Sequence, residues 1–240
     1  MKRIFILAFL IPSMSQAQLK DFIKKTTESV MTNTTKKNVF DISEGLKEAL
    51  NKGVTNQVSK LTAVDGFYGN ELVKIVLPDE LQKVDSMLRK IGMGNLADDG
   101  IKSLNRAAED AVKESTPIFV NAIKNITITD AKNILLGRED AATAFLQTGT
   151  RKPLYLKFNP VVQKSIGKVG ADAVWKTIID KYNKIPFVSK VNPDITDYVT
   201  NKALDGVFTM IALEEKDIRI NVNSRTSDLL KQVFALQDKK

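Results

Sequence analysis

The chain has 240 residues, carries a formal net charge of +8 and contains neither cysteine nor histidine. The lack of cysteine excludes disulfides, a thiolate nucleophile and attachment of a lipid to cysteine. The lack of histidine excludes Ser-His-Asp catalysis, histidine-based metal sites and histidine-centred phosphotransfer. Only carboxylates, lysine, tyrosine, serine and threonine remain for chemistry, and we expect no metal and no cofactor.

The first 17 residues, MKRIFILAFLIPSMSQA, have the pattern of a secretory signal peptide. A basic start is followed by an apolar run over residues 4–11 and by the small-residue cleavage signal Ser15-Gln16-Ala17. The apolar run is well short of the roughly 20 residues that span a bilayer, and no later segment reaches that length without charges. We therefore expect an exported chain that begins at Gln18 and has no transmembrane segment. Its expected location is therefore outside the cytoplasm.

Three parts are expected along the chain. Residues 1–17 are the signal peptide, and residues 18–40 carry a thin apolar stripe typical of a loosely docked helix or a tether. Residues 41–240 form an all-helical domain. Removal of the signal leaves 223 residues, enough for one large domain, and no linker, low-complexity segment or internal repeat marks a further boundary.

The first half of this domain shows helical periodicity. Apolar residues recur from Ile42 to Leu61 at the spacing of an amphipathic helix. Two aromatics between glycines then predict a tight, ordered loop over residues 65–70. Another helix is expected to begin at Pro78 and to end at residues 92–94, and a long apolar stripe covers residues 96–126. We expect Pro117 to kink or divide that stripe, because proline removes a backbone donor.

The second half also predicts helices, and no convincing run of alternating strands is present. One helix is capped by Thr129 or Asp130 and ends at Gly137, and five more cover residues 141–147, 160–169, 171–185, 195–218 and 227–236. Asp140 can cap the helix over residues 141–147. The brief alternation over residues 154–158 is expected to be extended. The predicted fold class is all-α, an irregular multi-helix bundle that forms a single domain.

Several motifs occur in an order that is characteristic of one family. They are Gly45–Leu50, Asp65–Asn70, Asn105–Glu109, Pro117–Phe119, Asp130–Gly137, Ala141–Thr143, Tyr198–Thr200, Phe208 with Glu214-Glu215, and Ile218-Arg219. Together they resemble the family of exported bacterial proteins known as domain of unknown function 4197. The resemblance extends over almost the whole chain after the signal. It implies an exported helical protein located in the periplasm, with the extracellular space as the alternative. It supplies no reaction, substrate or catalytic residue.

Charged residues on two predicted helices are the first candidates for a site. Arg106 and Glu109 are three residues apart and therefore neighbours on a helix, where they either form a partly buried ion pair or offer an arginine to a ligand. Glu215 continues an inward stripe and needs a cation. Arg219 can supply it from four residues further on, or Arg106 or Arg225 can supply it from elsewhere in the fold. Adjacent Glu214 and Glu215 diverge by about 100° on a helix, which disfavours their joint use as acid and base.

The aromatic loop is the other candidate. Asp65, Phe67 and Tyr68 either line the mouth of a ligand site or plug the end of the helix bundle. The candidate ligand-binding residues are therefore Asp65, Phe67, Tyr68, Arg106, Glu109, Glu215 and Arg219, and we assign no catalytic residue.

The positive charge favours an anionic partner, namely envelope lipid or an anionic cell-envelope polymer, although the basic residues are interspersed with acidic ones as on an ordinary solvated surface. Specific nucleic-acid binding is not expected. The leading hypothesis is a non-catalytic binding or envelope-accessory protein for an apolar or amphiphilic ligand. The alternatives are a carboxylate-based hydrolase of cell-wall or glycan substrates that uses Glu109, Glu214 or Glu215, and a structural partner-binding module.

Overall fold

A computed structural model describes residues 42–77, 82–90, 92, 94–168, 176–177, 179–180, 183–184, 186–187, 190, 192 and 194–238. The chain divides into two units, residues 1–41 and 42–240, and every described residue belongs to the second. The predicted signal peptide and the predicted tether over residues 18–40 lie outside the described residues, so both stay predictions.

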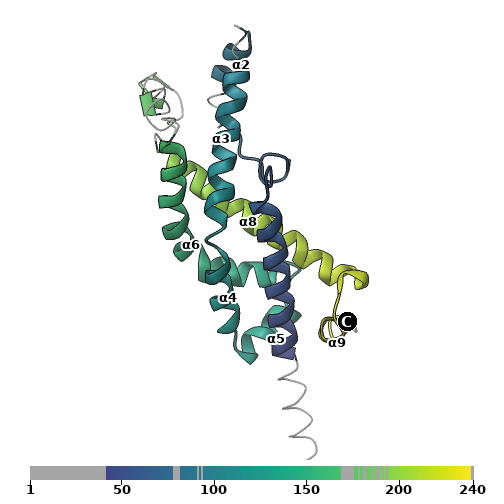
Figure 1. Cartoon of the computed structure of the whole chain (residues 1–240). Helices are drawn as coiled ribbons and strands as arrows, with labels where there is room; N and C mark the ends of the chain where they lie inside the picture. The colour runs from purple at the N-terminus through teal and green to yellow at the C-terminus, as the bar shows by residue number, and fades with distance from the viewer. Residues whose placement is uncertain are drawn as a thin grey trace, which may run out of the picture. The chain divides into compact units, whose positions relative to one another are not determined.

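The described part of the domain is built from helices and contains no strand, which confirms the all-α fold class (Figure 1). The first helix covers residues 42–62. It is followed by α2 (Gln82–Lys90), α3 (Gly94–Val112), α4 (Thr116–Lys124), α5 (Ile128–Leu136), α6 (Ala141–Gly167), α8 (Ile195–Ile220), a short 3-10 helix η2 (Val222–Ser224) and α9 (Asp228–Phe234). None of the helices in this part of the chain is long and apolar enough to cross a membrane.

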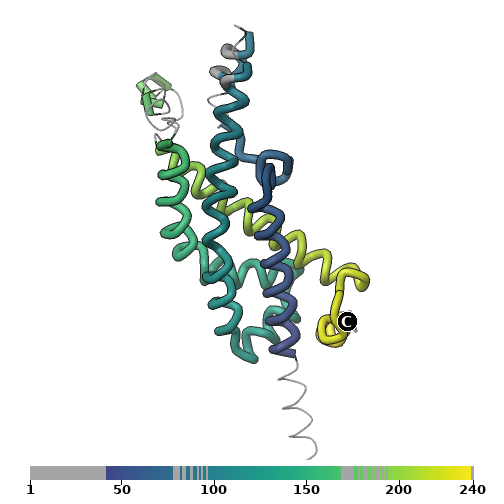
Figure 2. The backbone as a smooth tube through the Cα atoms, in the orientation of Figure 1, coloured from purple at the N-terminus to yellow at the C-terminus, as the bar shows by residue number. Residues whose placement is uncertain are grey.

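The centre of the bundle is formed by α3, α6 and α8, which pack against one another (Figure 2). Their shared core includes fully buried aromatic side chains. Phe119 of α4 meets Phe208 of α8 edge to face, with ring centroids 5.9 Å apart. The 42–62 helix contributes its predicted apolar stripe to the same core. The hydrophobic positions that the periodicity selected therefore fix which face of each helix turns inward.

Pro117 divides the long apolar stripe, as predicted. The helix α3 ends at Val112, and Pro117 then lies in the first turn of α4, where its missing N–H has no intrahelical partner to lose. The cap of α5 differs from the prediction. Its N-cap is Thr127, whose hydroxyl accepts the N–H of Asp130 while the Asp130 carboxylate accepts the N–H of Thr127. Asp130 therefore takes part at the third helical position of a capping box and not as the cap itself.

The sequence predicted two helices, over residues 141–147 and 160–169, with an extended segment over residues 154–158 between them. This prediction is wrong, because α6 is a single helix from Ala141 to Gly167 that includes residues 154–158. Two prolines, Pro153 and Pro160, lie inside it. Each removes the hydrogen bond to the carbonyl four residues earlier, at Gly149 and Leu156. Both of those residues are exposed, so water can bind the freed carbonyls on the outer side of the helix.

The buried side of α6 explains why the helix continues through the prolines. Its core residues recur at intervals of four, namely Leu146, Thr150, Leu154, Phe158, Val162 and Ile166. Because a helix has 3.6 residues per turn, a row with this spacing rotates slowly around the axis. The row lets one helix contact α8 and α3 along its length, and burial of these side chains offsets the cost of the prolines.

Candidate functional site

Arg106, on α3, holds the aromatic loop in place through two carboxylates. Its Nη2 nitrogen lies 2.8 Å from Asp65 Oδ1, and its Nη1 nitrogen lies 2.6 Å from Glu109 Oε2. The other Glu109 oxygen accepts the backbone N–H of Phe67 at 3.1 Å. The sequence-predicted residues Asp65, Phe67, Arg106 and Glu109 therefore converge, and their hydrogen bonds connect the loop to α3.

The two aromatics of the loop have different surroundings. Phe67 is fully buried, and its ring fills the space beside Gly206 of α8, where a Cβ atom would lie 2.7 Å from Phe67 Cε1. Tyr68 is only half-buried, and the Lys74 ammonium lies 4.5 Å from the centre of its ring. Phe67 therefore plugs the bundle, and Tyr68 is left at the surface as a cation-binding ring.

Asn105 secures the far end of the same loop. This buried side chain accepts the N–H of Ile75 at 2.8 Å and donates to the carbonyls of Ile75 and Ile101 at 2.8 Å each. The hydroxyl of Tyr198 also donates to the carbonyl of Val76. The loop from residue 63 to residue 77 is thus anchored at both ends by α3 and α8.

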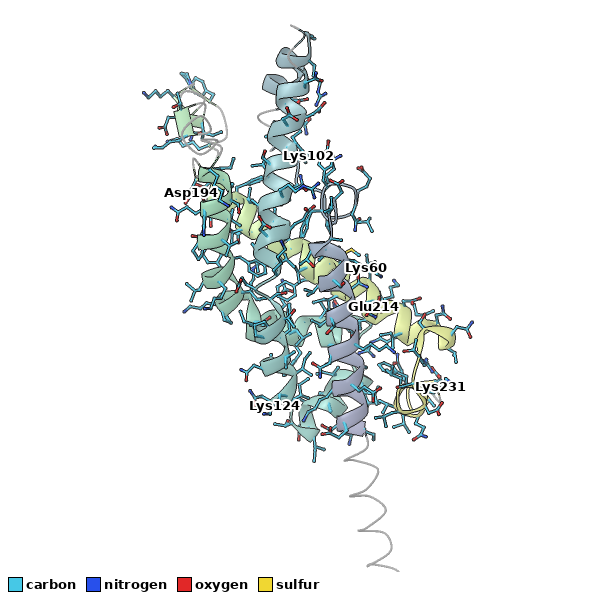
Figure 3. The ribbon with its side chains drawn as sticks, viewed as in Figure 1. Lys60, Lys102, Lys124, Asp194, Glu214 and Lys231 are labelled. Atoms are coloured by element: carbon cyan, nitrogen blue, oxygen red, sulfur yellow. The ribbon has the colours of Figure 1, made fainter. Side chains whose placement is uncertain are left out.

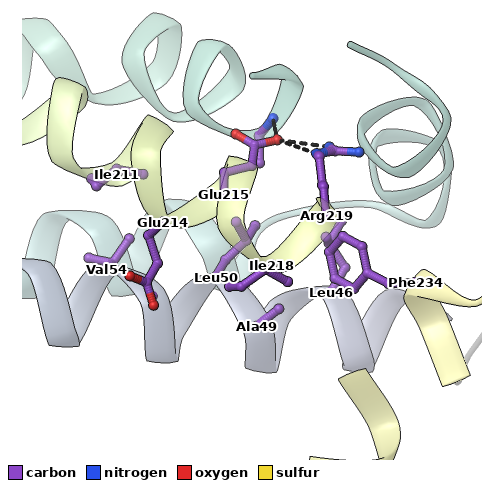
Figure 4. A pocket seen from close by; sticks show the side chains of 12 residues that line it. Leu46, Ala49, Leu50, Val54, Ile211, Glu214, Glu215, Ile218, Arg219 and Phe234 are labelled. Atoms are coloured by element: carbon purple, nitrogen blue, oxygen red, sulfur yellow. Dashed lines mark hydrogen bonds and ion pairs between the residues drawn. The ribbon is translucent and has the colours of Figure 1, made fainter. Parts of the chain in front are cut away.

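Glu215 and Arg219 form a separate cluster at the ends of α5 and α6 (Figure 4). Both side chains are buried, and they are joined by two hydrogen bonds of 2.8 and 3.0 Å. Glu215 accepts the N–H groups of Ala142 and Thr143 and the Thr143 hydroxyl, so it caps the N-terminus of α6. Asp140, the predicted cap, occupies the N-cap position but makes no side-chain capping bond.

Arg219 performs the complementary role at α5. Its guanidinium donates to the carbonyls of Ile134 and Leu135, which belong to the last turn of that helix. The charges match the helix dipoles, because the carboxylate faces an N-terminus and the guanidinium faces a C-terminus. The pair therefore satisfies backbone groups that would otherwise be buried without partners.

Arg225 continues this pattern at the end of α8. It donates to the carbonyls of Ile218 and Arg219 and pairs with Asp238 through two bonds of 2.5 and 2.9 Å. The hydrogen bonds from Arg225 hold the pKa of the Asp238 carboxyl below its usual value. The Phe234 ring lies under the guanidinium groups of both arginines, which connects α9 to the bundle.

The space beside Glu215 is too small for an organic ligand. The cavity between the 42–62 helix, α8 and α9, lined by residues such as Leu50, Ile211 and Phe234, has a volume of about 20 Å³ (Figure 4). That volume holds one water molecule, whereas ligand sites have roughly 300–1,000 Å³.

Both predicted carboxylates, Glu109 and Glu215, are buried and hydrogen-bonded to an arginine. Their contacts are those of structural groups.

The seven candidate residues do not form one site. Asp65, Phe67, Tyr68, Arg106 and Glu109 belong to the loop on α3, while Glu215 and Arg219 lie where α5, α6 and α8 meet. Within the described part of the chain, no hydrogen bond or ion pair joins the two groups. The same part of the chain contains no group of three or more carboxylates arranged to hold a metal ion.

A groove that the sequence reasoning missed lies between α6 and α8. It has a volume of about 660 Å³, and its lining residues are Ala144, Gln147, Thr148, Arg151, Lys152, Tyr155, Leu156 and Leu204. Leu204 forms an apolar floor, and Leu156 is an exposed wall with 65% of its surface accessible. Arg151 and Lys152 place positive charge at the edge, where Arg151 Nη1 pairs with Asp205 at 2.8 Å.

Tyr155 gives this groove a fixed aromatic wall. Its hydroxyl donates to Asp197 Oδ1 at 2.7 Å, and that carboxylate also accepts bonds from Asn192 and Asn201. The hydrogen bond to Asp197, together with burial, raises the pKa of Tyr155 to about 12. The hydrogen bond to Asp197 holds the ring in one orientation in the groove.

These features define an all-α domain in which a buried arginine–glutamate pair joins the ends of two helices, and in which the groove between α6 and α8 is cationic at its edge. Residues 35–235 match the family model described as "Protein of unknown function (DUF4197)", so the chain belongs to this family. Comparison with curated proteins gave no match. Comparison with solved structures gave none either.

Proposed function

We propose that the protein is an exported, non-catalytic binding protein of the bacterial envelope that holds an anionic amphiphile in the groove between α6 and α8. The observation that carries the proposal is the combination of apolar walls and cationic edge in a groove of about 660 Å³. This volume is within the range of ligand sites. An acyl chain fits against Leu156 and Leu204, and an anionic head group fits against Arg151 and Lys152.

The charges at the groove support an anionic head group. Arginine carries five N–H donors in a planar fork, and among the described residues Arg151 is paired only with the half-exposed Asp205. Lys152 is exposed beside it and has no carboxylate partner in the same part of the chain. The groove therefore offers two cations to a phosphate or carboxylate. The buried carboxylates Glu109 and Glu215 take no part in this proposal, and it requires no acid-base chemistry.

A direct binding measurement tests the groove. We expect lysophosphatidylglycerol, used below its micelle-forming concentration, to bind more tightly than lysophosphatidylcholine, whose head group has no net charge. The change Leu156→Asn removes an apolar wall that the acyl chain would cover, which corresponds to about 1–2 kcal/mol, or roughly a tenfold weaker affinity. Isothermal titration calorimetry on the wild type and the variant checks this expectation.

The matched control is Ile128→Asn, which replaces an equally large, exposed aliphatic side chain at the start of α5. It should bind lysophosphatidylglycerol as the wild type does. Equal binding by wild type and Leu156→Asn, or equal loss in both variants, would show that the groove is not the site.

Export is the other part of the proposal, and it rests on the pattern of residues 1–17. We expect the protein in a periplasmic fraction with an intact mass that corresponds to a chain starting at Gln18. A chain that retains residues 1–17 and fractionates with the cytoplasm would contradict export without affecting the groove.

A further inference from the structure

The outer side of α6 carries an exposed row of side chains. Lys152, Leu156, Pro160, Lys164 and Lys168 follow one another at intervals of four residues, and each is exposed. Residues four apart lie one above the other on a helix surface. The row therefore runs along the helix on the side away from its buried residues, and Lys157 is exposed next to Leu156. We call Lys152, Leu156, Lys157, Lys164 and Lys168 the α6 ridge.

The ridge has a charge pattern that the rest of the domain lacks. From Ala141 to Lys168 the sequence contains five cations and no aspartate or glutamate. Arg151 is paired with Asp205, but none of the four ridge lysines has a carboxylate partner among the described residues. Elsewhere, some exposed lysines, such as Lys113 and Lys216, are paired with nearby carboxylates, and others, such as Lys60 and Lys124, lie singly on different helices. The ridge therefore carries a row of positive charges without ion-pair partners, of which Lys168 alone lines a hollow with two carboxylates, Asp99 and Asp110 of α3.

An exposed aromatic follows the ridge along the chain. Phe187 is fully accessible to solvent and has a φ of 66°, a conformation that bulky residues rarely adopt. Lys184 and Lys190 on either side of it are also exposed. An aromatic ring thus occurs in water next to lysines, in the segment that follows α6 along the chain.

We propose that the α6 ridge and Phe187 dock onto the surface of an anionic lipid bilayer. Lysines near an anionic membrane are attracted by its surface potential, and several of them add up to stable but salt-sensitive binding. Leu156 and Phe187 give the preference for lipid over a soluble polyanion. Both side chains are exposed to water in the free protein, and both are buried when they enter the interfacial region of a bilayer.

Docking in this way has a consequence for the proposed binding function. Lys152 and Leu156 belong both to the ridge and to the lining of the α6–α8 groove. A bilayer bound to the ridge therefore lies against the opening of the groove, where an amphiphile can pass between the membrane and the protein. The docking itself does not rest on the proposed function, because the ridge and Phe187 act whether or not the groove is occupied.

The test is co-sedimentation of the protein with vesicles. We expect the protein to bind vesicles that contain phosphatidylglycerol, to bind pure phosphatidylcholine vesicles at least tenfold more weakly, and to dissociate as the salt concentration rises. The double change Lys164→Ser and Lys168→Ser should lower the partition coefficient roughly thirtyfold. The control is Lys60→Ser with Lys124→Ser, which removes the same charge from the 42–62 helix and α4 (Figure 3) and should change it less than twofold.

The change Phe187→Ser distinguishes binding to a lipid surface from binding to a soluble polyanion. It should weaken binding to anionic vesicles several-fold and leave binding to polyphosphate unchanged. Equal losses in the ridge variant and the control, or binding to polyphosphate without binding to vesicles, would overturn the proposal. A protein that binds lysophosphatidylglycerol but no vesicles would overturn the docking and retain the groove. A protein that binds anionic vesicles but not lysophosphatidylglycerol would retain the docking and overturn the groove. Thermal unfolding of each variant confirms that these surface changes leave the fold intact.

Discussion

Glu215→Gln is expected to destabilise the domain by about 3–5 kcal/mol. The carboxylate accepts three hydrogen bonds at the start of α6 and neutralises Arg219, whose side chain is almost completely buried. A glutamine directs an N–H group at donors that need an acceptor, and it leaves a buried guanidinium without a counter-charge. Urea unfolding followed by circular dichroism measures the loss.

The control for this prediction is Glu139→Gln. Glu139 pairs with Lys216 of the same helix α8, but both side chains are more than half exposed. Surface pairs of this kind contribute about 0–1 kcal/mol, so the same change of charge should have little effect. If Glu215→Gln were no more destabilising than Glu139→Gln, the result would contradict our inference that the buried Glu215–Arg219 pair stabilises the fold. Folded Glu215→Gln should still bind lysophosphatidylglycerol, because Glu215 does not line the α6–α8 groove.

Glu109→Gln is expected to cost about 2–3 kcal/mol and to loosen the loop over residues 63–77. The buried carboxylate accepts the Phe67 N–H with one oxygen and the Arg106 guanidinium with the other. The effect should be smaller than at Glu215, because one third of the Arg106 side chain is exposed and Asp65 remains as its partner. Urea unfolding measures the loss in the free energy of unfolding. Faster amide hydrogen exchange over residues 63–77 would show that the loss is located in the loop.

Asp65→Asn is the matched control for the loop. Asp65 binds the same arginine, but nearly half of its side chain is exposed. Its φ of 63° is in the left-handed region, which asparagine also tolerates. We expect a loss below about 1 kcal/mol and unchanged exchange in the loop. A larger effect from Asp65→Asn than from Glu109→Gln would contradict the anchoring role of the buried carboxylate.

The sequence predicted the helices with a regular inward face, and it missed the continuity of α6. Alternation over residues 154–158 and the prolines on either side indicate a break when only local preferences are considered. The structure shows that Leu154 and Phe158 belong to a buried row four residues apart. Whether a helix continues through a proline depends on tertiary burial and on which side the freed carbonyl faces, and neither is contained in a short window of sequence.

The charged clusters were predictable in part. The spacing of Arg106 with Glu109 and of Glu215 with Arg219 indicated both ion pairs, because residues three or four apart are neighbours on a helix. The spacing did not indicate that Glu215 caps α6 or that Arg219 binds the carbonyls of α5, since those partners are more than 70 residues away. Such contacts depend on how the helices cross.

The α6–α8 groove and the ridge were absent from the predicted site. A signal was present in the sequence, namely the run from Ala141 to Ala171 without a single carboxylate. No more than two basic residues are adjacent in it, so it does not stand out as a charge cluster. Only the continuous helix aligns Lys152, Lys164 and Lys168 into one row, and that continuity was the feature that the sequence did not predict.

Amide hydrogen exchange with and without lysophosphatidylglycerol tests directly our claim that the outer face of α6 binds the ligand. We predict slower exchange over residues 144–156 of α6 and the part of α8 around Leu204, with the loop over residues 63–77 unchanged. Protection confined to that loop and α3 would contradict the claim and would place the ligand at Asp65, Tyr68 and Arg106. Unchanged exchange throughout at saturating ligand would contradict it as well.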